Sequence, residues 1–158
     1  MQKPTLKKRM RTEKGKYDQG NYIPTNKEKY KGNYPIIYRS SWEKKFMNYC
    51  DISEMVESWG SENITIPYWN PVAKSVWKYY TDFIVRLRTP TEIITAVIEI
   101  KPFKQTQPPN YKNRKNKKTL LYEHNTWMTN KAKWESAEEF CRKRGWKFII
   151  MTEKDLKM

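Results

Sequence analysis

Apolar residues recur along this chain with two different spacings. Over residues 42–50 and 119–144 they return every three or four positions, which predicts two amphipathic helices. Ser40 and Ser41 precede the first helix and supply its N-cap, and Gly145 follows the second as its expected end. Residues 63–68, 76–87, 93–101 and 146–151 are short runs rich in β-branched and aromatic side chains, which predict four strands.

The order of these elements predicts the architecture. One helix comes first, three strands follow with short connections, and the long helix leads to the fourth strand. We expect the three strands to form an antiparallel meander, and the long helix to return the fourth strand parallel to its neighbour. The fold class is therefore α/β, a three-layer sandwich with a mixed central sheet and the element order αβββαβ.

The predicted strand at residues 93–101 is almost entirely apolar but ends on charged residues. Glu99 and Lys101 are two positions apart, so their side chains lie on the same face of the strand. A carboxylate at the end of a buried strand is costly unless a cation meets it. That cation is either Lys101, in a salt bridge, or a bound metal ion.

A second carboxylate lies on the preceding predicted strand. Asp82 interrupts a run of aromatic and β-branched residues, where Asp is a poor strand former. If the two strands pair antiparallel, Asp82 lies beside the Glu99 end, and the two acids make an oxygen site suited to Mg²⁺. Lys101 would then orient or deprotonate the attacking water, or stabilise charge on a phosphate. The alternative is a surface salt bridge between Glu99 and Lys101, with Asp82 as an ordinary strand-end residue.

The net charge of +15 is concentrated in two segments. Residues 1–32 contain ten Lys or Arg and three acids, and residues 103–118 contain six Lys or Arg and no acid. We therefore divide the chain into a basic flexible arm at 1–32 and a folded domain at 33–158 that carries a basic loop at 103–118. Charge of this kind is typical of nucleic-acid binding. The expected phosphate contacts are Lys7, Lys8, Arg9, Arg11, Lys112, Arg114, Lys115, Lys117 and Lys118.

The remaining composition excludes several other classes of protein. Aromatic residues make up 15% of the chain, enough to build a core. Two distant cysteines do not form a disulfide framework, and a single histidine cannot join them in a zinc site. No apolar run has membrane-spanning length, and the Lys-rich start lacks the apolar region of a signal peptide. We expect a protein of a reducing compartment with no membrane partner and no small-molecule cofactor.

An Asp on one strand and Glu-x-Lys on the next, in this order of elements, resembles the PD-(D/E)xK nuclease superfamily with its restriction-endonuclease-like core. Within it, Tyr-Arg-Ser-Ser-Trp-Glu at 38–43, Trp-Gly-Ser-Glu at 59–62 with Pro67-Tyr68, and Glu-Ile-Lys-Pro at 99–102 are similar to the head completion nucleases of T4-like phages. The likeness extends to the TnsA-type transposase nucleases and covers residues 33–156. Thr81 stands where the superfamily signature has proline, which removes no catalytic atom.

The resemblance implies specific roles for the candidate residues. Asp82 and Glu99 would bind Mg²⁺, with Mn²⁺ as a substitute and the carbonyl of Ile100 as a third ligand, and Lys101 would be the catalytic lysine. Glu43 on the first helix would complete or support the metal site, the alternative being a solvated carboxylate. Glu62 stays open between a supporting acid and a surface residue.

The expected function is that of a metal-dependent hydrolase, an endonuclease or exonuclease that cleaves or trims packaged DNA. It would act in phage head completion and head–tail joining, with DNA and phage head or portal proteins as partners, in the host cytoplasm or within the virion. Two alternatives remain open. One is a non-catalytic basic DNA-binding protein of the head or portal, and the other is a transposase-type or junction-resolving endonuclease.

Overall fold

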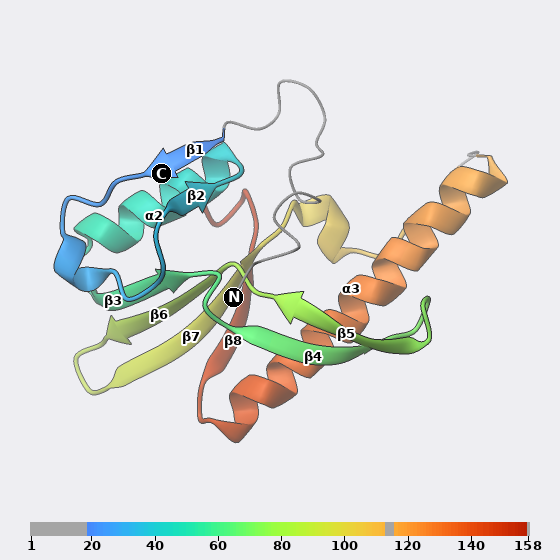
Figure 1. Ribbon diagram of the computed structural model, residues 1–158. Helices are drawn as coiled ribbons and strands as arrows, with labels where there is room; N and C mark the ends of the chain where they lie inside the picture. Colours follow the sequence, from blue (N-terminus) through green and yellow to red (C-terminus); the bar gives the residue numbers. More distant parts are fainter. Residues whose placement is uncertain (1–18, 113–115, 158) are drawn as a thin grey trace.

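The computed structural model describes residues 19–112 and 116–157. Its central sheet has the strand order β3–β6–β7–β8. Strands β3 (Val56–Ser61), β6 (Phe83–Arg88) and β7 (Ile93–Ile100) are antiparallel neighbours, and β8 (Lys147–Met151) runs parallel to β7. Helices α2 (Ser41–Ile52) and α3 (Lys117–Lys143) lie on opposite sides of the sheet (Figure 1). The predicted three-layer α/β sandwich with a mixed sheet is confirmed.

Strand β7 supplies side chains to both faces of the sheet. Ala96, Ile98 and Ile100 belong to the core cluster that includes Phe46 and Met47 of α2. Since successive side chains of a strand alternate, the intervening positions, Val97 and Glu99, face the side on which α3 packs. Glu99 is thus a polar residue on the α3 side of the sheet.

Capping residues mark the start of both helices, and a glycine follows the end of the second. The hydroxyl of Ser40 accepts from the N–H of Glu43 (3.1 Å), which confirms the serine N-cap of α2. The side chain of Asn116 accepts from the N–H of Thr119, so α3 begins at Lys117, two residues before the expected start. Gly145 has φ +71°, a left-handed conformation that costs glycine little and ends α3.

The predicted meander is wrong in its first strand. Strand β4 (Thr65–Asn70) pairs with β5 (Ser75–Tyr80) in a separate two-stranded sheet, and the edge of the central sheet is β3 instead. The predicted strand 76–87 is also two strands, because the chain passes from one sheet to the other at Thr81-Asp82. The N–H and hydroxyl of Thr81 both donate to the carbonyl of Ile64 (3.2 Å each), which closes the base of the β4–β5 hairpin.

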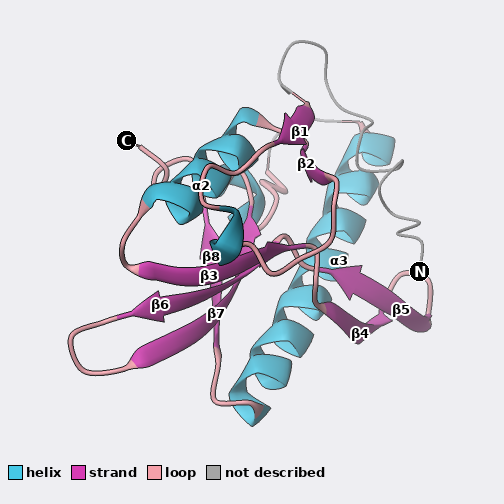
Figure 2. Cartoon of the chain, turned by 60° about the vertical axis from the view of Figure 1, so that its left-hand side comes forward, coloured by secondary structure: helices cyan, strands magenta, loops and turns pink. Residues whose placement is uncertain are grey.

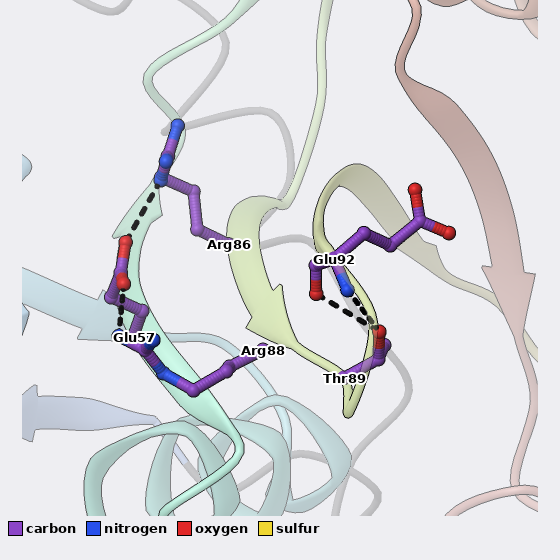
Figure 3. Close-up of polar contacts among 5 residues, drawn as sticks. All are labelled: Glu57, Arg86, Arg88, Thr89 and Glu92. Atoms are coloured by element: carbon purple, nitrogen blue, oxygen red, sulfur yellow. Dashed lines mark hydrogen bonds and ion pairs between the residues drawn. The ribbon is translucent and has the colours of Figure 1, made fainter.

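Exposed polar contacts accompany the strand pairing at one end of the central sheet. Strand β3 pairs with β6 through an irregularity at Glu57, whose carboxylate contacts Arg86 and Arg88 (Figure 3). In the turn between β6 and β7, the hydroxyl of Thr89 donates to the carbonyl of Glu92 (2.9 Å) and accepts from its N–H (3.0 Å). Such exposed contacts contribute little stability, but this register decides which residues meet at the opposite end of the sheet.

Part of the predicted basic arm belongs to the folded domain. Strand β1 (Gly20–Tyr22) pairs with β2 (Ile36–Tyr38), and the short 3-10 helix η1 (Lys27–Lys29) lies between them in sequence. Tyr30 is buried in the main core. The carboxylate of Asp51 on α2 accepts from the N–H groups of Thr25 (2.7 Å) and Asn26 (2.8 Å). Residues 1–18 lie outside the described part of the chain. The predicted basic loop also contains a 3-10 helix, η2 (Phe103–Thr106).

Candidate active site

The paired ends of β6 and β7 bring two carboxylates side by side. The ladder pairs Phe83 with Ile98, so Asp82 and Glu99 are the next residues on the two strands. Asp82 is 3% exposed and Glu99 is 5% exposed. The N–H of Ile100 donates to Oδ2 of Asp82 at 2.8 Å, which holds this carboxylate against β7. The antiparallel pairing thus gives the juxtaposition of Asp82 and Glu99 that the sequence suggested.

Lys101 lies at the solvent edge of this pair. Its Nζ is 3.6 Å from Oε2 of Glu99, and its side chain is 25% exposed. The N–H of Lys101 donates to the carbonyl of Met151 (2.9 Å), so the parallel neighbour β8 fixes the backbone of this residue. The ammonium group therefore lies beside the Glu99 carboxylate and is partly open to solvent.

Glu43 is buried at the first turn of α2. Its Oε1 accepts from the N–H of Arg39 (3.2 Å) while its own N–H donates to the Ser40 hydroxyl, so the carboxylate is held against the segment that leads into α2. Burial rules out the alternative of a solvated helix carboxylate. Its predicted role as a metal ligand stays a prediction.

A buried ion pair connects the start of α2 with the carboxylate site. The guanidinium of Arg39 contacts Oε2 of Glu62, and the two side chains are 4% and 6% exposed. The N–H of Glu62 in turn donates to the carbonyl of Asp82 (2.9 Å). The ion pair therefore helps to position the backbone at Asp82. Sequence reasoning left Glu62 open and assigned no role to Arg39, because 23 residues separate the partners and no local pattern relates them.

The donors at this site fit a divalent cation. Within the described residues, no group of three or more His, Cys, Asp or Glu side chains is placed to hold a metal ion by itself. Mg²⁺ does not need such a group, since it binds through one or two carboxylates with water and phosphate oxygens around it. Asp82 and Glu99 supply two carboxylates from adjacent strands, which is as many as such a site needs.

The thiols are poor candidates for nucleophilic catalysis. Cys50 and Cys141 are free and buried. Burial raises the pKa of the Cys50 thiol far above its ordinary value and raises the pKa of Cys141 to about 11. Both thiols are therefore protonated at neutral pH, and the reactive thiolate form is suppressed.

The predicted phosphate contacts are only partly covered by the structure. Lys112, Lys117 and Lys118 are exposed where α3 begins. The other six residues lie outside the described segments, namely Lys7, Lys8, Arg9, Arg11, Arg114 and Lys115. Among the helices that the structure describes, none has the length and apolar character needed to cross a membrane.

Two comparisons with known proteins place the site in a wider context. The family model described as "TnsA-like endonuclease N terminal" matches residues 53–153, a segment that contains Asp82, Glu99 and Lys101 but not Glu43. The head completion nuclease of Enterobacteria phage T4 is 37% identical to this chain over 142 residues. The matched region covers 87% of this chain and 93% of the phage T4 protein.

Proposed function

The chain belongs to the TnsA-like endonuclease family, and we propose that it hydrolyses phosphodiester bonds of DNA with a divalent metal ion during completion of a phage head. One observation carries the proposal. Two buried carboxylates, Asp82 and Glu99, meet at the paired ends of β6 and β7, with the ammonium of Lys101 3.6 Å from the second of them. This arrangement of acids and lysine suits metal-assisted phosphodiester hydrolysis.

Each residue of the site has a distinct part in the proposed reaction. Asp82 and Glu99 hold the metal ion, with the carbonyl of Ile100 as a further ligand and Glu43 as a supporting acid. A bound Mg²⁺, or Mn²⁺ in its place, would acidify a water molecule and neutralise charge on the phosphate. Lys101 orients the attacking water or donates to a phosphate oxygen, where it stabilises the negative charge of the transition state.

The basic segments hold the substrate. We assign the Lys and Arg residues of segments 1–32 and 103–118 to non-specific contacts with phosphates, since neutralising phosphates with Lys and Arg releases counterions regardless of sequence. The exposed side chains of Lys112, Lys117 and Lys118 support this assignment. Binding through these residues weakens steeply as salt is raised.

The biological setting is carried over from the phage T4 relative, whose name is head completion nuclease. In this setting the protein cleaves or trims packaged DNA, as an endonuclease or an exonuclease, before or as the tail joins. Its partners are DNA and phage head or portal proteins, and it works in the host cytoplasm or stays in the virion. Two buried free cysteines suit a reducing compartment.

A plasmid-cleavage assay with and without divalent metal tests the proposed function. We expect Asp82→Asn and Lys101→Met to lower the cleavage rate about a hundredfold or more while DNA binding persists. Glu92→Gln and Lys147→Met are matched controls, because both residues are exposed and lie toward the opposite end of the same sheet. Cleavage by Asp82→Asn at the wild-type rate would overturn the assignment. Linear, nicked and branched substrates then separate head-completion trimming from junction resolution.

A further inference from the structure

The β4–β5 hairpin leaves one of its faces uncovered. It runs out from the end of the central sheet along α3 (Figures 1 and 2). Its inner face packs on this helix, through Ile66, Tyr68 and Tyr79 against Ala137. The Nζ of Lys133, also on α3, lies 5.5 Å from the ring centroid of Tyr79. The outer face has no such cover in the described part of the chain.

Large apolar side chains are concentrated on the uncovered part of the hairpin. Trp69 is 58% exposed and Val76 is 67% exposed, and these two residues pair directly across the strands. Val72 at the tip is 44% exposed, and Trp77, which pairs with Tyr68 and so lies on the other face, is 48% exposed. Several exposed apolar side chains in one short segment mark a surface that meets a partner, because leaving them in water forgoes the free energy of burial.

The exposed face leads directly to the carboxylate site. Strand β5 ends at Tyr80, two residues before Asp82. Lys78 and Val76 lie on one face of β5, since residues two apart share a face, and their cross-strand partners are Pro67 and Trp69. At the rise of a β-strand, Lys78 is about 13 Å and the Val76–Trp69 pair is about 20 Å from Asp82 along the chain. Because the chain passes from one sheet to the other at Thr81-Asp82, these contour lengths are upper limits on the straight distances from Asp82.

The charge of the hairpin indicates which class of molecule it binds. Residues 63–81 contain Lys74 and Lys78 and no acidic residue. A polyanion suits this surface, whereas a second copy of a chain with net charge +15 would be repelled. The tip is also held in shape, because Oδ1 of Asn70 accepts from the N–H groups of Val72 and Ala73 (2.9 Å each). A preformed basic hairpin with an exposed indole matches the platforms on which unpaired bases stack.

We propose that the β4–β5 hairpin binds unpaired DNA next to the cleavage site. Trp69 stacks on a base within a few nucleotides of the scissile phosphate, and Lys78 contacts a phosphate between the two points. An indole can stack only where the face of a base is open, so the favoured substrate has single-stranded character beside the cleavage point, as at a DNA end or gap. This inference rests on the proposed function in one respect, because it takes Asp82 and Glu99 as the point of cleavage.

Fluorescence anisotropy of labelled oligonucleotides in EDTA tests the hairpin apart from catalysis. The full chain, Trp69→Ala, Trp69→Phe and Lys78→Ala are compared on a single strand and on a duplex of the same length. We expect Trp69→Ala to weaken single-strand binding about 5- to 100-fold and duplex binding less than about twofold, with Trp69→Phe restoring most of the loss. Lys78→Ala weakens binding to both substrates and lowers the salt dependence.

A matched control variant and a measurement of self-association keep the outcomes distinct. Ile52→Ala removes an equally exposed apolar side chain (62% exposed) from the end of α2 and should leave binding unchanged. Unchanged single-strand binding by a folded Trp69→Ala protein would overturn the proposal. Equal losses on single strand and duplex would overturn the stacking role, and loss of self-association with intact DNA binding would assign the face to a second copy. Because no cleavage occurs in EDTA, these results do not depend on the plasmid assay, whose failure would overturn only the proposed function.

Discussion

The buried ion pair between Arg39 and Glu62 gives the sharpest prediction about stability. Glu62→Gln removes the negative charge while keeping nearly the same shape, and it leaves the guanidinium of Arg39 buried. The two side chains are 4% and 6% exposed, so water cannot replace the lost carboxylate. An uncompensated buried charge costs about 3–5 kcal/mol. We expect about 3 kcal/mol here, because the amide oxygen still accepts a hydrogen bond from Arg39.

The same reasoning predicts that a double substitution restores the stability lost in Glu62→Gln. Replacing both partners with apolar residues, as in Arg39→Met with Glu62→Leu, removes the buried charges together and should restore most of the stability. The matched single control is Glu57→Gln. Glu57 also contacts arginines, Arg86 and Arg88, but its side chain is 31% exposed, so this change should cost less than about 1 kcal/mol.

Urea unfolding followed by tryptophan fluorescence measures these differences as shifts of the midpoint. In a thermal melt, 3 kcal/mol corresponds to a decrease in Tm of about 6–12 °C for a chain of this size. Glu62→Gln should also slow DNA cleavage, because the N–H of Glu62 holds the carbonyl of Asp82. A loss of stability no larger than that of Glu57→Gln would refute the view that this pair is a buried structural link.

Two further changes test separate parts of the fold. Burial raises the pKa of Asp51, but the N–H groups of Thr25 and Asn26 and the Tyr22 hydroxyl outweigh it and hold the pKa below its ordinary value of 3.8. A depressed pKa stabilises the folded state above about pH 4. This contribution is lost as the pH falls, so the urea midpoints of the wild type and Asp51→Asn should differ at neutral pH and draw together as the pH is lowered below about 4. Gly145→Ala places a side chain in open space at φ +71° and should cost about 1 kcal/mol in the same urea assay, purely from the backbone conformation. An unchanged midpoint would contradict the left-handed end of α3.

The sequence predicted elements whose apolar pattern is strong and local. The run from Ile93 predicted β7, the helical spacing predicted α2 and α3, and the Asp82–Glu99 juxtaposition followed from antiparallel pairing. Strand β3 was missed because residues 56–61 do not alternate between apolar and polar. Its burial comes instead from distant partners, such as the rings of Tyr30 and Phe83 that pack around Trp59.

The remaining errors also arise from contacts that are distant in sequence. Residues 76–87 look like one strand because Tyr79–Tyr80 and Phe83–Ile84 are equally good strand formers. The break at Thr81-Asp82 comes from the hydrogen bonds of Thr81 to Ile64, 17 residues away. The Arg39–Glu62 pair spans 23 residues and gave no signal in the sequence. Local patterns therefore located the strands that carry Asp82 and Glu99, whereas the groups that support these strands required the structure.

The most direct test of the account is the metal dependence of DNA cleavage by the wild type and by Asp82→Asn in parallel. The account predicts that wild-type protein cleaves plasmid only with Mg²⁺ or Mn²⁺, and that EDTA abolishes cleavage but not salt-sensitive binding. It also predicts that Asp82→Asn binds DNA normally and cleaves at least about a hundredfold more slowly. Cleavage that survives EDTA, or full activity of folded Asp82→Asn, would contradict the claim that Asp82 and Glu99 form a metal-dependent nuclease site.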